Sequence, residues 1–479
     1  MQFFETAQAT SVLSGTSRTS SHPRPASCQW FSWISAALDC RSVPRLALLV
    51  PAAHMQNPAM RNRPAAGTSP TATPTAVQPP RTATPPVAGA PARRFDAPPE
   101  IANITDQTVR MIVRTSVGGR RVRIRIANAF GTPSLSIGAA HIARRAAGSG
   151  TVRGSDRRLT FGGGPTATVY AGQVIISDPV DFVVPPLADL AVSLYVPGDA
   201  GIPTSHRFGL RPTYLSMPGN YAGAAEIESV ATTTQSYYWL AGVDVLAPTD
   251  GGTLVTFGDS ITDGDQSTPD TSGMWPALLA RRLQANASTK HIGVVNAGIS
   301  GNRLLGDNNS GVVRFVQHAL SVPGVKWITV LEGINDISGA TRQNRVGAAT
   351  AGTPASAAPF SAEDLIRAYR QMIEAAHLRG VKVIGCTITP FGGSSTFTER
   401  GEAIRVAVND WIRTSGAFDA VIDFDAATRD SEDPQRFRAE ADSPDLLHPG
   451  DGGYRLMADA VNLGVFTRRE PPPSPSRRR

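Results

Sequence analysis

Apolar residues follow two different patterns along the chain, and the pattern changes near residue 250. Between residues 96 and 247, short alternating segments are separated by Gly, Pro and Asn turns. In residues 121–126, RVRIRI, the apolar side chains face one way and the arginines the other, as a half-buried antiparallel strand requires. This part is predicted to be an antiparallel β-sandwich or jelly roll. Its other candidate strands are residues 108–114, 135–142, 166–177, 180–184 and 190–195.

From residue 253 onward, apolar runs alternate with helix-like segments. This alternation predicts an α/β fold in the flavodoxin-like style, with a parallel sheet covered by helices on both faces in three layers. Ser361 is the predicted N-cap of the third helix, and Gly380 its left-handed stop. The expected strands are residues 253–257, 292–296, 327–331, 382–387 and 420–424, and the expected helices are residues 274–284, 312–320, 362–379, 402–414 and 453–461.

The two ends of the chain fit neither pattern. Residues 1–95 are rich in Pro, Ala, Ser and Thr, and residues 468–479 in Pro and Arg. Such segments bury too little apolar surface to offset the entropy of ordering, so both are predicted to be disordered. The predicted domains are therefore a β-sandwich-like domain at 96–247 and a catalytic domain at 248–467. Residues 41–53, RSVPRLALLVPAA, resemble a secretory signal at an unusual position, which makes secretion an expectation, and no run has the length of a transmembrane segment.

The positive charge of the chain lies at its ends. Residues 1–95 hold nine Arg and two acidic residues, and residues 468–479 hold five Arg and one Glu. The ends account for +7 and +4 of a total of +7, which leaves −4 for the part between them. A mildly acidic folded part argues against a nucleic-acid partner.

The cysteines indicate neither a metal site nor a disulfide framework. There are three, Cys28, Cys40 and Cys386, with no C-x-x-C pair and no Cys/His cluster at zinc spacing. Cys386 ends an apolar run and is expected to be a buried apolar residue rather than a reactive thiol. Cys28 and Cys40 could pair only in an oxidising compartment.

Four short motifs fall where strands of the predicted sheet end, at the edge where open α/β sheets bind ligands. Acyl transfer needs a nucleophile, a base, a group that fixes the base and donors for the oxyanion, and these motifs contain residues for each task. They are GDS at 258–260, NAGISGNR at 296–303, EGIND at 332–336 and DLLH at 445–448.

In their order and residues, these motifs resemble those of the GDSL, or SGNH, hydrolase family, over roughly the second half of the chain. The resemblance implies that Ser260 is the nucleophile and that Asp445 and His448 are its catalytic partners. It also implies an oxyanion hole formed by the N–H groups of Ser260 and Gly301 and the side-chain amide of Asn335. No cofactor and no metal are implied. In this family a small residue often follows the aspartate, whereas here the position is occupied by Leu446.

His448 is the histidine best placed to act as the base. It follows Asp445 by three residues in a loop near the sheet edge, so that one ring nitrogen can face the serine while the other donates to the carboxylate. The other histidines are in the leader, the β-rich part, helices or a strand start: His22, His54, His141, His206, His291, His318 and His377.

An alternative interpretation makes the acidic residues near this edge ligands of Mg²⁺ or Ca²⁺. Strand-end aspartates more often cap the following helix, and Asp259 in particular is expected to shape the serine turn. The long polar stretch 338–360 could be a lid or an insertion. The residues of the metal alternative are Asp259, Asp263, Asp336, Asp423 and Asp425.

The expected function is a serine ester hydrolase that acts on short-acyl carboxylic esters through an acyl-enzyme at Ser260. The added β-domain suggests an alternative, a polysaccharide O-acetylesterase. An inactive carbohydrate-binding surface module is a third possibility. The aromatic group Tyr237-Tyr238-Trp239 could then stack on sugars, although sealing of a domain interface is favoured. The arginine stripe of residues 121–126 is either a solvated strand face or a surface for an anionic substrate.

Overall fold

The computed structural model describes residues 82–83, 103–246, 251–306, 309–345 and 359–467. Residues 76–479 form one compact unit. Residues 103–246 are called the β-rich region below, and residues 251–467 the α/β region. Cys28, Cys40, the signal-like segment, the tail, nearly all of the leader and residues 346–358 of the long polar stretch lie outside the described residues.

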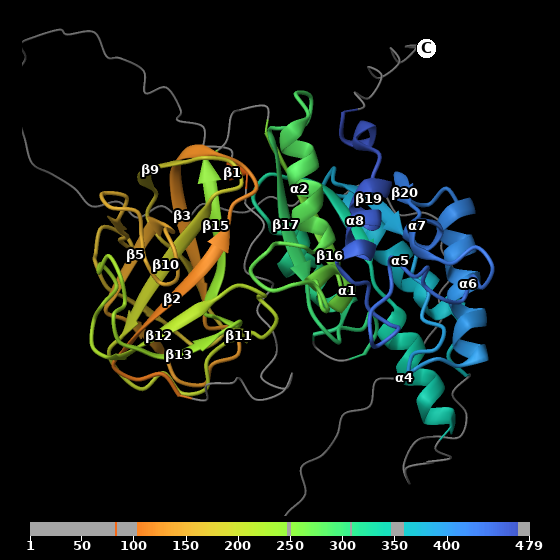
Figure 1. Cartoon of the computed structure of the whole chain (residues 1–479), viewed down its shortest axis with the longest axis horizontal. Coiled ribbons are helices and arrows are strands. Elements are labelled where there is room, and N and C mark those ends of the chain that lie inside the picture. The colour runs from red at the N-terminus through yellow and green to blue at the C-terminus, as the bar shows by residue number, and fades with distance from the viewer. Residues whose placement is uncertain (1–81, 84–102, 247–250, 307–308, 346–358, 468–479) are drawn as a thin grey trace, which may run out of the picture. The chain divides into compact units, whose positions relative to one another are not determined.

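A five-stranded, entirely parallel sheet forms the centre of the α/β region (Figure 1). Its strand order is β17-β16-β18-β19-β20, so the first strand in sequence lies between the second and the third. This is the flavodoxin-like order, in which ligands bind at the carboxyl end of the first strand, where the chain changes direction across the sheet. The strands are β16 (Gly252–Gly258), β17 (Ile292–Gly298), β18 (Val325–Leu331), β19 (Lys382–Cys386) and β20 (Ala420–Ile422).

The helices of the α/β region form two groups by their contacts: α2, α7 and α8 in one, and α3, α4, α5 and α6 in the other. Two such groups correspond to the two outer layers of the predicted three-layer fold, which is confirmed. The helices are α1 (Ser260–Asp263), α2 (Trp275–Ala285), α3 (Gly311–Phe315), the π-helix η1 (Val316–Leu320), α4 (Ile334–Arg345), α5 (Ala362–His377), α6 (Glu399–Thr414), α7 (Phe424–Thr428), α8 (Asp451–Ala460) and the 3₁₀-helix η2 (Leu463–Phe466).

Local signals explain most of the element boundaries. Asp364 accepts a hydrogen bond from the Ser361 N–H at 2.8 Å, which confirms the predicted start of α5, and Gly380 has the expected left-handed φ of 66°. The predicted last strand was two residues too long. Asp423 accepts from the Ala426 N–H and is the N-cap of α7, so β20 ends at Ile422.

Two large antiparallel sheets form the β-rich region, with strand orders β13-β12-β2-β10-β5-β6 and β15-β3-β8. In the second sheet β9 pairs with β3, and β1, from outside the region, pairs with β15. Two small sheets, β11-β14 and β4-β7, also belong to the region. Apolar residues of both sheets share one core, which confirms the predicted sandwich. The strands are β1 (Thr82–Ala83), β2 (Gln107–Arg114), β3 (Gly119–Ala127), β4 (Leu135–Ile137), β5 (Ala139–Arg144), β6 (Arg157–Arg158), β7 (Ala167–Val169), β8 (Val174–Ile176), β9 (Val180–Val184), β10 (Asp189–Val196), β11 (Ser205–His206), β12 (Thr213–Pro218), β13 (Val230–Thr234), β14 (Tyr237–Tyr238) and β15 (Leu240–Leu246).

The structure departs from the strand predictions in several places, and strands β12, β13 and β15 were not predicted. Two long candidate strands, 135–142 and 166–177, are each divided into two shorter strands. Strand β1 lies in the segment that was predicted to be disordered, where it pairs with the end of β15. Its two residues are too few to show a strand period in the sequence.

The side chains of the arginine stripe (residues 121–126) and of the aromatic group (residues 237–239) have partners within the protein. Arg123 and Arg125 pair with the buried Asp244 at 2.9 and 2.5 Å, so both guanidinium groups have a partner within the sheet. Tyr237, Tyr238 and Trp239 are at most 3% exposed and belong to the core of the sandwich. A sugar-stacking platform at these three residues is therefore wrong, because their ring faces are covered.

No helix among the described residues has both the length and the apolar character that crossing a membrane requires.

Candidate active site

Ser260 lies at the first position of the short helix α1, two residues after the end of the interior strand β16. Asp259 is the N-cap, and its side chain accepts the Ile261 N–H at 3.0 Å. The prediction that this aspartate shapes the turn is confirmed. The first N–H groups of a helix have no partner within the helix, so the Ser260 N–H is available at this point. Their partial positive charge also favours an anion beside the serine.

Two glycines allow the backbone of α1 to pack closely on the sheet. A Cβ at Gly258 would lie 2.2 Å from the Thr262 Oγ1, and a Cβ at Gly298 would lie 2.2 Å from the Asp263 N. These distances are far shorter than van der Waals contact. The two motif glycines thus fix the position of the serine by close packing, in addition to allowing a turn.

We expect Gly298→Ala to lower the free energy of unfolding by about 1–3 kcal/mol, because the added methyl group must push α1 away from β17. Since α1 carries Ser260, kcat should also fall. Urea unfolding and ester hydrolysis measure the two effects. Gly198→Ala is the matched control, because its Cβ would meet no atom within 4 Å. Equal results for the two variants would contradict the role of close packing.

His448 connects Ser260 with Asp445. The His448 Nε2 lies 2.7 Å from the Ser260 Oγ, and the His448 Nδ1 lies 2.6 Å from the Asp445 Oδ2. Burial by itself would raise the pKa of Asp445, but hydrogen bonds from His448 and Leu447 outweigh it and lower the pKa to about 2. The carboxylate is thus ionised at neutral pH and accepts a hydrogen bond from the Nδ1–H of His448. The lone pair of the His448 Nε2 then faces the serine.

The loop of this pair has an unusual backbone. Leu446 has a φ of 56°, in the left-handed region that glycine adopts most easily. This is the position at which the family often has a small residue. The Asp445 Oδ1 accepts the N–H groups of Leu447 and His448, at 3.0 and 2.9 Å, and these bonds hold the loop despite the unfavourable φ.

Gly301 and Asn335 meet at one tight turn. The Asn302 N–H donates to the Ile299 carbonyl at 3.0 Å, and Gly301 takes the third position of this turn with a φ of 76°. Asn335, in the first turn of α4, donates a side-chain N–H to the Asn302 carbonyl at 2.9 Å. We call residues 299–302 the oxyanion loop below.

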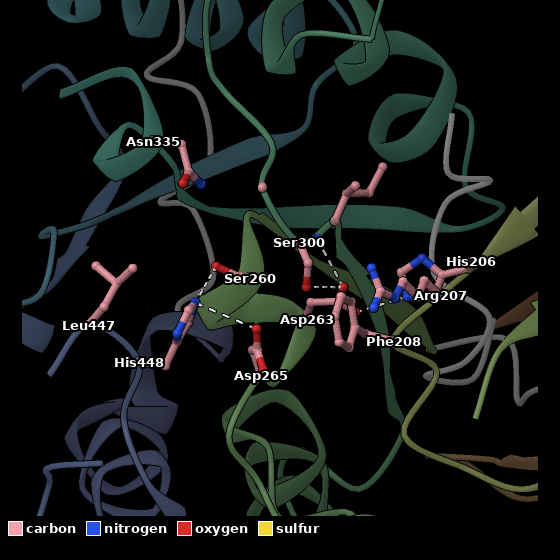
Figure 2. A pocket seen from close by; sticks show the side chains of 12 residues that line it. His206, Arg207, Phe208, Ser260, Asp263, Asp265, Ser300, Asn335, Leu447 and His448 are labelled. Carbon is pink, nitrogen blue, oxygen red and sulfur yellow. Dashed lines mark hydrogen bonds and ion pairs between the residues drawn. The ribbon is translucent and has the colours of Figure 1, made fainter. Parts of the chain in front are cut away.

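One pocket of about 310 Å³ is lined by all the predicted residues except Asp445, which contacts His448. Figure 2 shows Ser260, Asn335 and His448 around this pocket. Ser260, Gly301, Asn335 and His448 line it. The structure therefore brings together the nucleophile, the base and the oxyanion donors that were assigned from the sequence. Their catalytic roles stay predictions. The pocket also contains residues that the sequence did not indicate: His206, Arg207, Phe208 and Asp265.

Arg314 is a further residue that the sequence did not indicate. It is 1% exposed and donates to the carbonyls of Gly258 and Ala297 at 2.7 and 2.8 Å. It also donates to the Asn302 side chain at 2.6 Å and pairs with Glu332 at 2.8 Å. One guanidinium thus ties the ends of three strands to the oxyanion loop. A helix with the sequence GVVRF gives no sign of this burial.

The acidic residues near the sheet edge have protein partners instead of a metal arrangement. Asp259 caps α1, and Asp336 accepts the N–H groups of Leu304 and Leu305 at 2.7 and 2.9 Å. Asp423 and Asp425 pair with arginines. Within the described residues, no group of three or more His, Cys, Asp or Glu could hold a metal ion. Asp259 and Asp423 thus cap helices, Asp336 holds a loop, and Asp425 pairs with arginines.

Burial changes the ionisation of the acids beneath the site. It raises the pKa of Asp259 to about 7 and that of Asp336 to about 6. Burial likewise raises the pKa of the Cys386 thiol, in line with the expectation of an unreactive, buried cysteine. The contrast with Asp445 is chemically useful, because only an ionised carboxylate can stabilise an imidazolium at His448.

The arrangement fits acyl transfer to a serine. The Ser260 hydroxyl donates to a ring nitrogen of His448, whose other nitrogen is held by an ionised carboxylate. Backbone and amide donors lie in the same pocket. Such a set can remove a proton from the serine, stabilise an oxyanion and return the proton to a leaving group.

Comparisons with known proteins found a matching family model and similar solved structures. Residues 256–456 match the model of the GDSL-like Lipase/Acylhydrolase family. No curated protein matched the chain. Three similar solved structures are a lipolytic protein of the G-D-S-L family from Desulfitobacterium hafniense DCB-2, an acetyl xylan esterase, AlAXEase, and the native M. smegmatis aryl esterase.

Their sequence identities with this chain are 20%, 20% and 15%, and each has a TM-score of 0.32. The alignments cover 46%, 43% and 44% of this chain, and 100%, 96% and 96% of the respective structures. Residues 256–456 of the α/β region, which contain the four motifs and most of the sheet, thus match the GDSL-like lipase/acylhydrolase family.

Proposed function

We propose that this protein is a serine ester hydrolase that cleaves short-acyl carboxylic esters through an acyl-enzyme at Ser260. The observation that carries the proposal is the continuous contact from the Ser260 Oγ through His448 to Asp445, at 2.7 and 2.6 Å. An inactive carbohydrate-binding module has no need of this contact. The pocket volume of about 310 Å³ supports a short acyl group.

In the first half of the reaction, the His448 Nε2 removes the Ser260 proton as the Oγ–carbon bond forms. The electron pair of the carbonyl moves to its oxygen, which accepts hydrogen bonds from Ser260, Gly301 and Asn335. Collapse of this intermediate breaks the bond to the alcohol oxygen, and His448 gives its proton to that oxygen. Water then attacks the acyl-enzyme in the same way and releases the acid.

A polysaccharide O-acetylesterase is the second candidate, and one observation favours it. Residues 206–208 of the β-rich region line the pocket beside the serine, so the alcohol part of a substrate would meet that region. Rates with a series of p-nitrophenyl esters and acetate release from acetylated xylan distinguish the two substrates. Faster turnover of the acetylated polysaccharide would favour this candidate over a small-ester hydrolase.

Asn335→Ala should lower kcat by about 10²–10³ with little change in KM, because the amide acts on the oxyanion and not on the ground-state carbonyl. Steady-state hydrolysis of p-nitrophenyl acetate measures both constants. Asn220→Ala is the control, because Asn220 is exposed and lies in the β-rich region. Asn409→Ala is unsuitable, because Asn409 is buried and bonded to Ile388. An unchanged kcat in Asn335→Ala would remove this residue from the oxyanion hole.

The test of the function itself is covalent labelling with a fluorophosphonate probe. We expect the full-length protein to be labelled at one serine and Ser260→Ala to remain unlabelled, because only an activated serine attacks phosphorus rapidly. Mass spectrometry of the labelled peptide identifies the residue. A folded wild-type protein that is neither labelled nor able to hydrolyse any tested ester would refute the proposed function.

A further inference from the structure

One wall of the catalytic pocket belongs to the β-rich region. Strand β11 ends at His206 and pairs with β14, whose two tyrosines are buried in the core of the sandwich. The His206 ring stacks on Tyr237, with ring centroids 6.5 Å apart and planes 14° apart. His206 is therefore held by rigid neighbours at the position where it enters the pocket of Ser260.

His206 forms a buried hydrogen bond with Asp263 of helix α1. The His206 Nε2 lies 2.9 Å from the Asp263 Oδ1, and the two residues are only 4% and 3% exposed. Asp263 follows the nucleophile by three residues on the same short helix. A contact between residues 57 positions apart thus joins the β-rich region to the element that carries Ser260.

The second oxygen of Asp263 holds the oxyanion loop. The Asp263 Oδ2 accepts the Ser300 N–H at 3.0 Å and the Ser300 Oγ–H at 2.9 Å. Figure 2 shows Asp263 between His206 and Ser300. Because both carboxylate oxygens have partners in a buried site, the carboxylate has one favoured orientation.

Ser300 directly precedes Gly301 in the turn that presents the predicted oxyanion donor. On the other side, the Asn302 carbonyl is held by Asn335. An oxyanion donor is effective only within about 2.7–3.1 Å of the developing charge, so a small rotation of this turn weakens it. The orientation of the Gly301 N–H therefore depends on the Asp263 carboxylate.

We propose that His206 is a positioning residue of the esterase reaction, through which the β-rich region holds the oxyanion loop by way of Asp263 and Ser300. This inference rests on the proposed serine esterase function. It assigns the β-rich region a part in the chemical step, in addition to any part in substrate binding. His206 itself touches neither the reacting atoms nor the oxyanion.

The main experiment compares His206→Ala and His206→Gln in the full-length protein, with p-nitrophenyl acetate as the substrate. Active sites are counted in each variant by complete fluorophosphonate labelling, so that kcat refers to folded enzyme only. We expect His206→Ala to lower kcat by roughly 10- to 100-fold with KM nearly unchanged, the size of effect that a misplaced catalytic group produces. His206→Gln should restore most of the loss, because its amide N–H can replace the Nε2–H donor.

His141→Ala is the matched control. His141 also lies in the β-rich region and also contacts an aspartate, Asp156, at 2.9 Å, but it does not line the catalytic pocket. We expect its kcat to equal that of the wild type. If His206→Ala matches His141→Ala in kcat per labelled site, or if His206→Gln is no better than His206→Ala, the positioning role is wrong.

A double-mutant cycle separates positioning from general destabilisation. Ser300→Ala removes one of the two hydrogen bonds to the Asp263 Oδ2 and should lower kcat less than His206→Ala. If both residues act through Asp263, the double variant should lose less than the product of the two single losses. Fully multiplicative losses would show that they act independently, against the proposal. Failure of the proposed function is a separate result, namely a wild-type protein that is neither labelled nor active.

Discussion

His448→Ala should lower kcat by about 10⁶-fold, whereas Asp445→Asn should lower it by about 10⁴-fold. Among the described residues, the partner of the Ser260 Oγ that can accept its proton is His448. Asp445→Asn keeps an oxygen for the N–H groups of the loop but loses the charge that stabilises the imidazolium. The substitution Asp445→Asn also favours the His448 tautomer that carries its proton on Nε2, so that no lone pair faces the serine.

Asp265 is a second carboxylate near His448, with which the role of Asp445 can be compared. Its carboxylate lies 3.8 Å from the His448 Nε2, on the opposite side of the ring from Asp445. It can favour a positive imidazole ring, but it cannot accept the Nδ1 proton. Asp265→Asn should therefore have a much smaller effect on kcat than Asp445→Asn. If Asp265 oriented His448 instead, Asp265→Asn would lower kcat more than Asp445→Asn.

Steady-state kinetics with p-nitrophenyl acetate measure these losses, with His377→Ala as the control. His377 pairs with Asp419 at 2.8 Å on the half-exposed side of α5, so it tests the loss of a His–Asp pair as such. Its kcat should equal that of the wild type. Similar activity in His448→Ala and His377→Ala would mean that another group is the base.

The sequence predicted which residues gather at the edge of the sheet, because most of them follow strands. Parallel strands end at one edge of a sheet, so Ser260, Gly301 and Asn335 had to lie near one another once the strands were recognised. Asp445 and His448 were also expected at a strand end, which is wrong, because the last strand of the sheet ends at Ile422 and is followed by α7. They were found because a carboxylate and a histidine three residues apart resemble the family motif.

The supporting residues could not be predicted, because their roles depend on tertiary contacts. His206 lies on a two-residue strand that has no recognisable period, and its partner is in another region of the chain. Leu446 was noted as a departure from the family, but its left-handed φ follows from the bonds that Asp445 makes to the loop. Local propensity carries no information about either contact.

Arg314→Met should lower the free energy of unfolding by about 3–5 kcal/mol, the usual cost of removing one partner of a buried ion pair. The substitution leaves the Glu332 carboxylate buried without its cation, and it removes donors from the Gly258 and Ala297 carbonyls. Arg314 also stacks on Phe257, at 3.9 Å from the ring centroid. Urea unfolding measures the loss, and kcat should fall as well, since Asn302 is released.

Arg367→Met is the control for this substitution. Arg367 is 58% exposed and pairs with Asp364 and Glu363 on the surface of α5, where an ion pair contributes at most about 1 kcal/mol. If the two variants unfold at the same urea concentration, the buried pair does not stabilise the fold. The comparison holds residue type and substitution constant, and it changes burial and the hydrogen bonds of the guanidinium.

The pH dependence identifies Glu332 as the source of the loss. Burial raises the pKa of Glu332 above its ordinary value of 4.5, while Arg314 acts in the opposite direction. Without Arg314, burial acts alone, so the folded variant binds a proton that the unfolded chain releases as the pH rises above about 4.5. Its deficit relative to the wild type should therefore be smaller near pH 4 than at pH 7. Arg314→Met combined with Glu332→Gln should remove most of this pH dependence, and a deficit that is constant from pH 4 to pH 7 would assign the loss to the unpaired carbonyls instead.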